Sequence, residues 1–477
     1  MQNFLKKNKI PLLLVVTCVV FYIAFAYQLE RSDFIKLISL FGCLFFLTYK
    51  ILQINKGRFW FLAGIGILFR LVFIAVLPNL SQDFYRFIWD GRLVFQGISP
   101  YLFTPESVVN NLSSRLLSEA FKESNRTIVL QAQELYKGMG TLNGSHFSNY
   151  PPINQLFFAI AALFAGKSVL GSVVVMRIFI ILADVGILYF GRKLLWKLNQ
   201  DPDKIFWYFL NPFVIIELTG NLHFESVMLF FVIWSLYLLY QKKWIWSAVL
   251  IGISVSVKLI PLLFLPLFYQ WFVKQVSFKI GVFKLFFFHL VIVGMVALTF
   301  LPFYTPLFVS NFSKTLALWF QIFEFNASVY YIIRWVGFKV VGWNVIETVG
   351  KVLPLIVIGF LVILTFFRNN RNLKQLITAM LFGISFYYLL STTVHPWYIA
   401  TPLLLSVFTN YKFPIVWSLL VMLSYSAYGT QGFSEKLWWV ALEYIVVIGI
   451  FVWEVFLKKN NTSFKTQSLQ YINTMKD

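Results

Sequence analysis

The sequence predicts an all-α polytopic membrane protein, a bundle of about 12–14 transmembrane helices with one large outer loop that carries interfacial helices. Of the 477 residues, 59% are hydrophobic and only 12% are charged. A soluble protein of this size cannot bury so much apolar surface, so lipid must solvate most of it. The 40 Lys and Arg residues give a formal net charge of +21. They gather in short clusters between apolar runs, which favours anionic lipid over nucleic acid as their partner.

Apolar runs long enough to approach or complete a bilayer crossing occur along the whole chain. The first run is too long for a cleaved signal peptide and no small-residue cleavage site follows it, so we interpret it as a retained span. The candidate spans are residues 10–28, 35–53, 59–77, 171–191, 204–220, 222–240, 244–257, 259–273, 280–302, 344–366, 373–391, 397–409, 413–428 and 437–457.

The basic clusters predict the orientation, because Lys and Arg near span ends stay in the cytoplasm. All clusters agree with cytoplasmic N- and C-termini if segment 151–165 lies along the interface instead of crossing. The clusters are residues 6–9, 55–58, 191–197, 241–243, 274–279, 368–374 and 458–461. The segments then predicted outside are 78–150, 217–226, the region around Lys258, 303–343 and 391–398. Most of the unusual polar residues fall in these outer segments, which suggests one shared site.

The first outer loop opens with the charged cluster "DFYRFIWDGR". Asp83 is a candidate general base, because partial desolvation at the membrane surface raises the pKa of a carboxyl toward neutrality. The alternative is that Ser81 or Asp83 caps a short helix that begins here. If residues 82–95 form an interfacial helix, Asp83, Arg86 and Asp90 share one face. Arg86 either clamps a phosphate or pairs with a carboxylate. Asp90 and Arg92 join it as candidate substrate-binding residues.

Four polar residues, Glu217, Asn221, His223 and Glu225, interrupt two apolar spans in "ELTGNLHFES". Such groups are costly in a membrane unless they line a wet cavity or pair with each other. Three interpretations stay open, namely a turn that contacts sugar or acceptor, a metal site and a hydrogen-bonded structural turn. No familiar metal-ligand spacing appears, so we assign no metal ligand and no cofactor, with a divalent cation left open.

Three further candidates for substrate binding carry or can carry positive charge. Lys258 in "SVSVKLIPL" either reaches for the interface or binds an anion, and its place on the outer face favours phosphate binding. His395 in "HPWY" has three alternatives, phosphate contact, proton shuttling and a helix cap. Arg334 in "VYYIIRWVG" is a candidate third cation. Arg177 and Asp184 lie on one face of a span, where we expect a structural pairing or packing role.

Five segments, taken in order, resemble GT-C glycosyltransferases that use polyprenyl-phosphate sugars. The nearest resemblance is to mannosyltransferases of glycosyltransferase family 87 and to the catalytic subunit of GPI mannosyltransferase I. The segments are "DFYRFIWDGRLVFQGISPY", "YPPINQ", "NPFVIIELTGNLHFESVMLFF", "KLIPLLFLP" and "HPWY". The resemblance implies a catalytic core over 59–400, with 1–58 as an added hairpin and 401–477 as C-terminal helices and a short cytoplasmic tail. Family members carry an essential acid in the first large outer loop, which Asp83 matches. Their paired DxD acids are absent, since Asp83 and Asp90 are seven residues apart.

The resemblance implies inverting transfer of a sugar, expected to be mannose, on the outer face of a bacterial plasma membrane. The implied partners are a polyprenyl-phosphate-linked donor, a glycan or glycolipid acceptor and membrane lipids, and not nucleic acid. Asp83 would take the acceptor proton. The leaving phosphate would be stabilised by Lys258, His395, Arg334 or Arg86.

Three other functions remain open. A transporter or flippase of lipid-linked sugars would show broken helices near the midplane and an inverted repeat. A glycan ligase or polymerase would use the same face. A noncatalytic assembly partner would tolerate Asp83→Asn.

Overall fold

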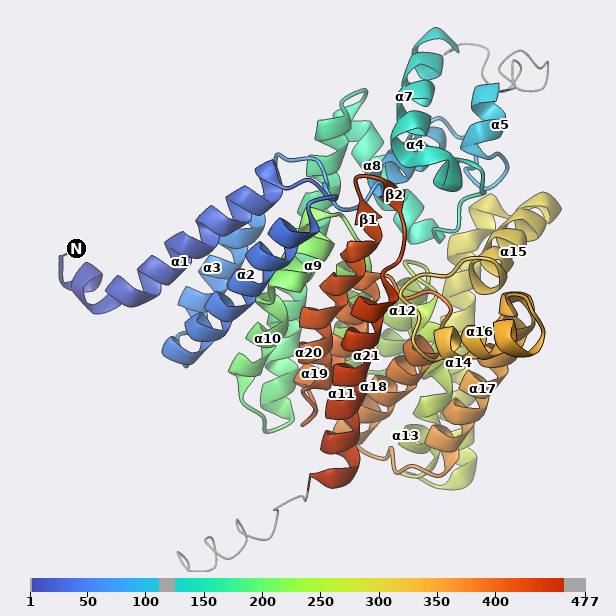
Figure 1. Ribbon diagram of the computed structural model, residues 1–477. Coiled ribbons are helices and arrows are strands. Elements are labelled where there is room, and N and C mark those ends of the chain that lie inside the picture. The colour runs from blue at the N-terminus through green and yellow to red at the C-terminus, as the bar shows by residue number, and fades with distance from the viewer. Residues whose placement is uncertain (1, 111–124, 459–477) are drawn as a thin grey trace, which may run out of the picture.

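The computed structural model describes residues 2–110 and 125–458, and within these ranges the chain is almost entirely helical (Figure 1). The α-helices are α1 (Gln2–Gln28), α2 (Phe34–Ile54), α3 (Phe59–Leu71), α4 (Asp83–Phe95), α5 (Pro105–Asn110), α7 (Asn125–Gly144), α8 (Pro152–Ala165), α9 (Val169–Lys197), α10 (Phe206–Phe209), α11 (Glu225–Tyr240), α12 (Trp244–Val255), α13 (Tyr269–Val273), α14 (Phe278–Phe300), α15 (Pro306–Gln321), α16 (Val329–Val340), α17 (Ile346–Phe366), α18 (Leu373–Leu390), α19 (Ala400–Val407), α20 (Phe413–Leu420) and α21 (Leu437–Val452).

Short 3₁₀ and π turns continue several helices, and one small hairpin of strands follows α20. The 3₁₀ segments are η1 (Pro202–Ile205), η3 (Ile260–Phe268), η4 (Leu301–Phe303), η5 (Pro396–Ile399) and η6 (Val421–Ala427), and the π turns are η2 (Val214–Gly220) and η7 (Trp453–Leu457). In the described ranges the strands are β1 (Tyr428–Gly429) and β2 (Gly432–Phe433), paired antiparallel. The predicted all-α fold class is therefore confirmed. The predicted tail after Lys458 and residues 111–124 of the outer loop lie outside the described residues.

Seven helices in the described part of the chain are long and apolar enough to cross a bilayer. They are Lys9–Gln28, Phe34–Ile54, Val169–Lys197, Phe278–Phe303, Ile346–Phe366, Leu373–Leu390 and Leu437–Leu457. The elements η2 and α11 meet at a bend of 110° and add an eighth if they form one broken span. Shorter apolar helices, such as α3 and α12, lie between them. The polytopic character is confirmed, and the total of 12–14 crossings stays a prediction.

Segment 151–165, which we expected to lie along the interface, forms α8. This helix has 14 residues and is therefore about 21 Å long, less than the thickness of the hydrocarbon core of a bilayer. It packs mainly against α4 and α9. Its length is compatible with the expected orientation, which stays a prediction.

Three of the predicted cytoplasmic clusters, residues 55–58, 191–197 and 241–243, are connected by hydrogen bonds at or next to them. The backbone N–H of Gly57 donates to the carboxylate of Asp203 at 2.8 Å, which joins the 55–58 cluster to the turn after α9. The hydroxyl of Tyr240 donates to the carbonyl of Lys197 at 3.0 Å, which joins the next two clusters. Helices α4, α5 and α7 and the β1–β2 hairpin lie at the opposite end (Figure 1). The basic clusters and the predicted outer loop are thus separated along the bundle.

Buried arginines fix the helices behind the outer loop. Arg70 pairs with Asp184 at 2.9 Å, and both side chains are fully buried. Arg177 instead donates to backbone carbonyls, among them those of Thr219 and Val76, each at 2.8 Å. The expected structural role of Arg177 and Asp184 is confirmed, but each has a different partner, because α3 brings Arg70 beside the acid. Arg177 holds the start of the outer loop against η2.

Candidate functional site

Helix α4 presents Asp83 as its first residue. Gln82 precedes the helix without a side-chain cap, and the N–H of Asp83 donates to the hydroxyl of Ser81 at 3.3 Å. The carboxylate of Asp83 does not cap the helix but accepts a hydrogen bond from Nδ2 of Asn143 at 3.1 Å. The helix expected over 82–95 is therefore confirmed, and the capping alternative for Asp83 is wrong. A half-buried carboxylate in a first helical turn also benefits from the free N–H groups there.

Two opposing influences act on the Asp83 carboxyl. Burial raises its pKa above the ordinary aspartate value, while the hydrogen bond from Asn143 and the positive charges of Lys258 and Arg31 lower it. Burial is the larger influence. The group is therefore a stronger proton acceptor than an exposed aspartate, and cations stand close enough to stabilise an anion beside it.

Lys258 and Glu225 form an ion pair in this region, between the turn after α12 and the start of α11. The Lys258 side chain is 18% exposed and the Glu225 side chain 3%. The second carboxylate oxygen of Glu225 is buried and has no hydrogen-bond partner among the described residues. The pair therefore neutralises most of the Lys258 charge and leaves one acceptor unused.

An aromatic stack joins the two histidines predicted for the site. The ring centroids of His223 and Trp397 are 3.6 Å apart, and those of Trp397 and His395 are 4.5 Å apart. Phe325 lies 5.3 Å from His395 on its other side. Burial, with the nearby cations, lowers the pKa of His395 to about 3, so this ring is neutral at physiological pH. His395 precedes η5 without a side-chain capping hydrogen bond, which contradicts the helix-cap alternative.

Glu217 lies between His223, at one end of this stack, and Tyr425, which leads back to Phe325 at the other end. These residues therefore form a closed ring of contacts. Glu217 is fully buried in η2 and accepts a hydrogen bond from the hydroxyl of Tyr425 at 2.8 Å. Its other oxygen lies 3.8 Å from Nε2 of His223, and neither atom has a hydrogen bond within the described residues. Tyr425 continues to Tyr428 at 5.9 Å between ring centroids, and Tyr428 to Phe325 at 6.1 Å. A buried polar atom without a partner calls for an explanation, such as a catalytic role or a bound water or ion.

Asn221, from the same turn, has a structural role. Its side-chain oxygen accepts from the N–H of Leu80 at 3.0 Å, and its amide donates to the carbonyl of Ile216 at 3.1 Å. It thereby ties the chain just before Asp83 to η2. Within this turn, Asn221 has the structural hydrogen-bonding role that was one of the alternatives. Glu217 and His223 each keep a buried polar atom without a hydrogen-bond partner among the described residues.

Arg86 and Asp90 support Asp83 from within the outer loop. Arg86 pairs with Asp90 at 2.8 Å and also donates to the carbonyl of Asn143 at 2.8 Å. The carboxylate of Asp90, which is fully buried, accepts from Gln155 at 3.1 Å. Of the two alternatives for Arg86, a phosphate clamp and pairing with a carboxylate, the structure shows the pairing with a carboxylate. This pairing fixes Asn143, which in turn holds the Asp83 carboxylate.

Arg92 and Arg334 are not brought to Asp83 by any described contact. Arg92 donates to the carbonyl of Lys167 at 3.0 Å. Arg334 forms an ion pair with Glu324, and its guanidinium lies 4.3 Å from the centre of the Tyr331 ring. Each of these two cations meets a partner of its own, and their predicted role in substrate binding stays a prediction.

The metal alternative for the 217–226 turn has no ligand set in the described ranges. No three or more His, Cys, Asp or Glu side chains there form a group that could hold a metal ion.

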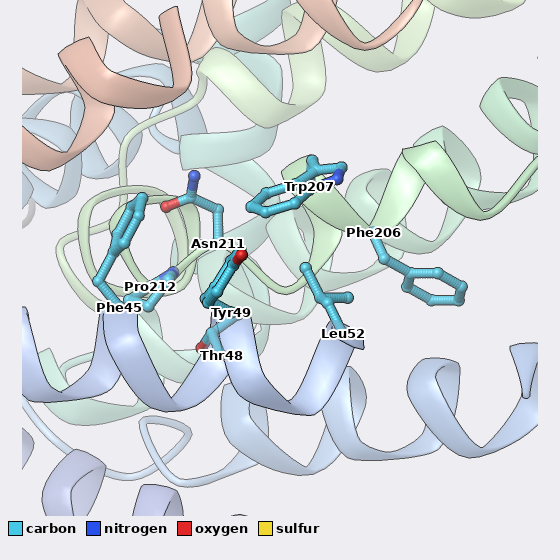
Figure 2. A pocket seen from close by; sticks show the side chains of 8 residues that line it. All are labelled: Phe45, Thr48, Tyr49, Leu52, Phe206, Trp207, Asn211 and Pro212. Carbon is cyan, nitrogen blue, oxygen red and sulfur yellow. The ribbon is translucent and has the colours of Figure 1, made fainter. Parts of the chain in front are cut away.

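Figure 2 shows a pocket between α2 and the segment around α10. Its lining residues are Phe45, Thr48, Tyr49, Leu52, Phe206, Trp207, Asn211 and Pro212. The lining is mostly aromatic and aliphatic and includes no predicted site residue. This pocket is therefore separate from the candidate site around Asp83.

Several residues of the site escaped the sequence predictions. The guanidinium of Arg31 lies 3.2 Å from the centre of the Tyr428 ring, beside the ring of contacts described above. Arg31 falls between the first two predicted spans, on the outer face, where the positive-inside rule disfavours a cation. The same signal drew attention to Lys258. Nothing in the sequence distinguishes Asn143 from the other polar residues of its loop.

Comparisons with known proteins bear on the same region. Residues 61–274 match the family described as "Alpha-(1->6)-mannopyranosyltransferase, N-terminal domain". The protein named "Alpha-(1->6)-mannopyranosyltransferase A" from Corynebacterium glutamicum is 24% identical over 219 residues. The aligned part spans 44% of this chain and 39% of that relative. The matched range includes Asp83, Glu217 and Lys258 and ends before His395. The resemblance to membrane mannosyltransferases, predicted from the ordered motifs, is confirmed by these matches.

Proposed function

We propose that the protein transfers a mannosyl group from a polyprenyl-phosphate donor to a glycan or lipid-linked acceptor on the outer face of a bacterial plasma membrane. The family match and the apolar helices support a membrane mannosyltransferase. The observation that carries the proposal is the assembly around Asp83. Lys258, from a distant segment of the chain, lies near enough for its charge to act on both the half-buried carboxylate of Asp83 and the ring of His395.

In the proposed reaction, the acceptor hydroxyl approaches Asp83, which takes its proton. The acceptor oxygen attacks C1 of the sugar from the face opposite the phosphate, so the configuration at C1 inverts. The bond between C1 and the phosphate oxygen breaks, and its electron pair leaves with the polyprenyl phosphate. Lys258 stabilises the growing negative charge, and neutral His395 donates a hydrogen bond from its ring N–H. A phosphate leaves without protonation, so one carboxylate suffices where glycoside hydrolases use two.

The direct test compares wild type with Asp83→Asn in a transfer assay with radiolabelled polyprenyl-phosphate mannose. Asparagine has the same shape and still offers an oxygen to Asn143, so the fold should survive. We expect kcat to fall by roughly 10²- to 10⁴-fold, the range for losing a general base. Asp201→Asn, at an exposed position in the turn after α9, is the matched control and should leave the rate unchanged. Full turnover by Asp83→Asn would remove Asp83 from the mechanism.

One observation favours a second candidate, a transporter of lipid-linked sugars. The 110° bend between η2 and α11 fits either a re-entrant loop or a broken span, and broken spans are the kind of element that transporters use. Unlike transfer, translocation needs no proton acceptor. Movement of a labelled polyprenyl-phosphate sugar across sealed vesicles, without acceptor and undiminished in Asp83→Asn, would favour this candidate.

A further inference from the structure

The turn between α1 and α2 reaches the candidate site. Asn79, four residues before Asp83, donates to the carbonyls of Phe25 and Leu29 at 2.8 and 3.2 Å. The hydroxyl of Tyr27 donates to the carbonyl of Val72 at 3.2 Å. In Figure 1 this turn approaches the β1–β2 hairpin. The N-terminal hairpin is therefore fastened to the segment that carries Asp83.

Arg31 projects from this turn toward the site. Its guanidinium lies over the ring of Tyr428, and its Nε is buried without a hydrogen-bond partner. Its positive charge lowers the pKa of both Asp83 and His395, after the larger effect of burial on each. The geometry agrees, because the Tyr428 ring under Arg31 lies 6.1 Å from Phe325, which in turn lies 5.3 Å from His395.

Arg31 differs from Lys258, Arg334 and Arg86, because no carboxylate among the described residues pairs with it. Lys258 pairs with Glu225, Arg334 with Glu324, and Arg86 with Asp90. A guanidinium offers a planar fork of N–H donors that matches phosphate oxygens, and it stacks on aromatic rings. The Tyr428 ring holds the guanidinium of Arg31 by its face, and the Nε donor of Arg31 is left without a hydrogen-bond partner among the described residues.

We propose that Arg31 binds the phosphate of the polyprenyl-phosphate donor. This inference rests on the proposed function and extends it, because it adds the N-terminal hairpin to the substrate site. The hairpin lies outside residues 61–274, the range that matches the mannosyltransferase family. Lys258 then serves mainly to neutralise Glu225 and adds a second, weaker positive charge. Arg31 carries the positive charge that is free for the donor.

The test measures equilibrium binding of radiolabelled polyprenyl phosphate to the purified chain in detergent, together with KM and kcat for transfer. Arg31→Gln should weaken binding of polyprenyl phosphate by roughly 10- to 100-fold, the effect of losing a hydrogen-bonded charge. KM should rise to a similar extent, with a smaller change in kcat. Arg31→Lys keeps the positive charge but loses the planar fork of donors. Its binding of polyprenyl phosphate should lie between that of wild type and that of Arg31→Gln. Lys56→Gln, an exposed position at the other end of the hairpin, is the charge-matched control and should behave as wild type.

The outcomes separate this inference from the function on which it rests. If transfer occurs and Arg31→Gln leaves both binding and KM unchanged, the phosphate site is overturned and the function stands. If no polyprenyl-phosphate sugar is turned over but Arg31→Gln still weakens binding of polyprenyl phosphate, the function fails and the site stands. Phosphatidic acid serves as competitor. Equal displacement by this lipid would mean that Arg31 holds an ordinary membrane headgroup, which overturns its assignment to the donor.

Discussion

The ion pair of Lys258 and Glu225 allows structural and catalytic roles to be measured separately. Lys258→Met keeps most of the apolar stem but leaves the Glu225 carboxylate, 3% exposed, without its cation. Removing one partner of a buried pair costs about 3–5 kcal/mol. The Lys258 side chain is 18% exposed, so water already weakens this pair, and we expect a loss of about 2–3 kcal/mol. Reversible unfolding in dodecyl sulfate micelles measures this change in the free energy of unfolding.

The double variant Lys258→Met/Glu225→Gln tests the reasoning. Without the buried charge, its stability should return to within about 1 kcal/mol of wild type, because a neutral pair no longer carries a desolvation penalty. Its transfer rate should stay low, by roughly 10²-fold, if Lys258 also stabilises the leaving phosphate. Recovery of both stability and rate would refute the catalytic role, leaving Lys258 as a counter-ion. Failure to recover stability would refute the ion-pair reasoning.

Two further predictions concern the acid limb of the pH profile and the buried arginine behind the site. Burial raises the pKa of Asp83 above that of an ordinary aspartate. Because the base becomes protonated below this pKa, kcat/KM should fall as the pH drops through it. Asn143→Ala removes a hydrogen bond that lowers this pKa and should move the midpoint to higher pH; an unmoved midpoint would mean that another group sets the limb. Arg177→Met strands several buried carbonyls and should cost about 3–5 kcal/mol in the same micelle unfolding assay. Arg192→Gln, in the cluster at the opposite end, should change stability by less than about 1 kcal/mol, and a similar loss in both variants would contradict the special role of Arg177.

Topology explains which parts of the site could be predicted from the sequence. The positive-inside rule assigns each loop to one end of the bundle, and so it grouped Asp83, the 217–226 turn, Lys258 and His395 correctly. The rule says nothing about position within the membrane plane. Arg334 was assigned to the same end of the bundle, but its ion-pair partner there is Glu324 rather than Asp83. The helix considered over 82–95 is present as α4, whereas the placement of Asn143 depends on the fold of a loop and has no local signal.

At the N-terminus, the resemblance to known enzymes drew attention away from a residue of the site. Because the resembling segments begin near residue 59, the first two spans were treated as an addition without a role in the site. Their connecting turn nevertheless carries Arg31, and Asn79 fastens it to the outer loop. A residue outside the resembling range can be recognised only from its contacts. In this case the sequence held one usable signal, a cation on the face where cations are disfavoured.

The charges around Asp83 also bear on the direction of the proposed reaction. Before transfer, negative charge resides on Asp83 and on the phosphodiester of the donor. Afterwards Asp83 holds a proton and the released polyprenyl phosphate can carry two charges, so one charge has moved from the acid to the phosphate. Burial disfavours the charged form of Asp83, while Arg31 and Lys258 favour charge nearby. Burial lowers the energy of the state after transfer, in which Asp83 is neutral, whereas the two cations stabilise ionised Asp83 before transfer and the doubly charged phosphate after it. The same arrangement should hold polyprenyl phosphate more tightly than the donor, which would make product release slow.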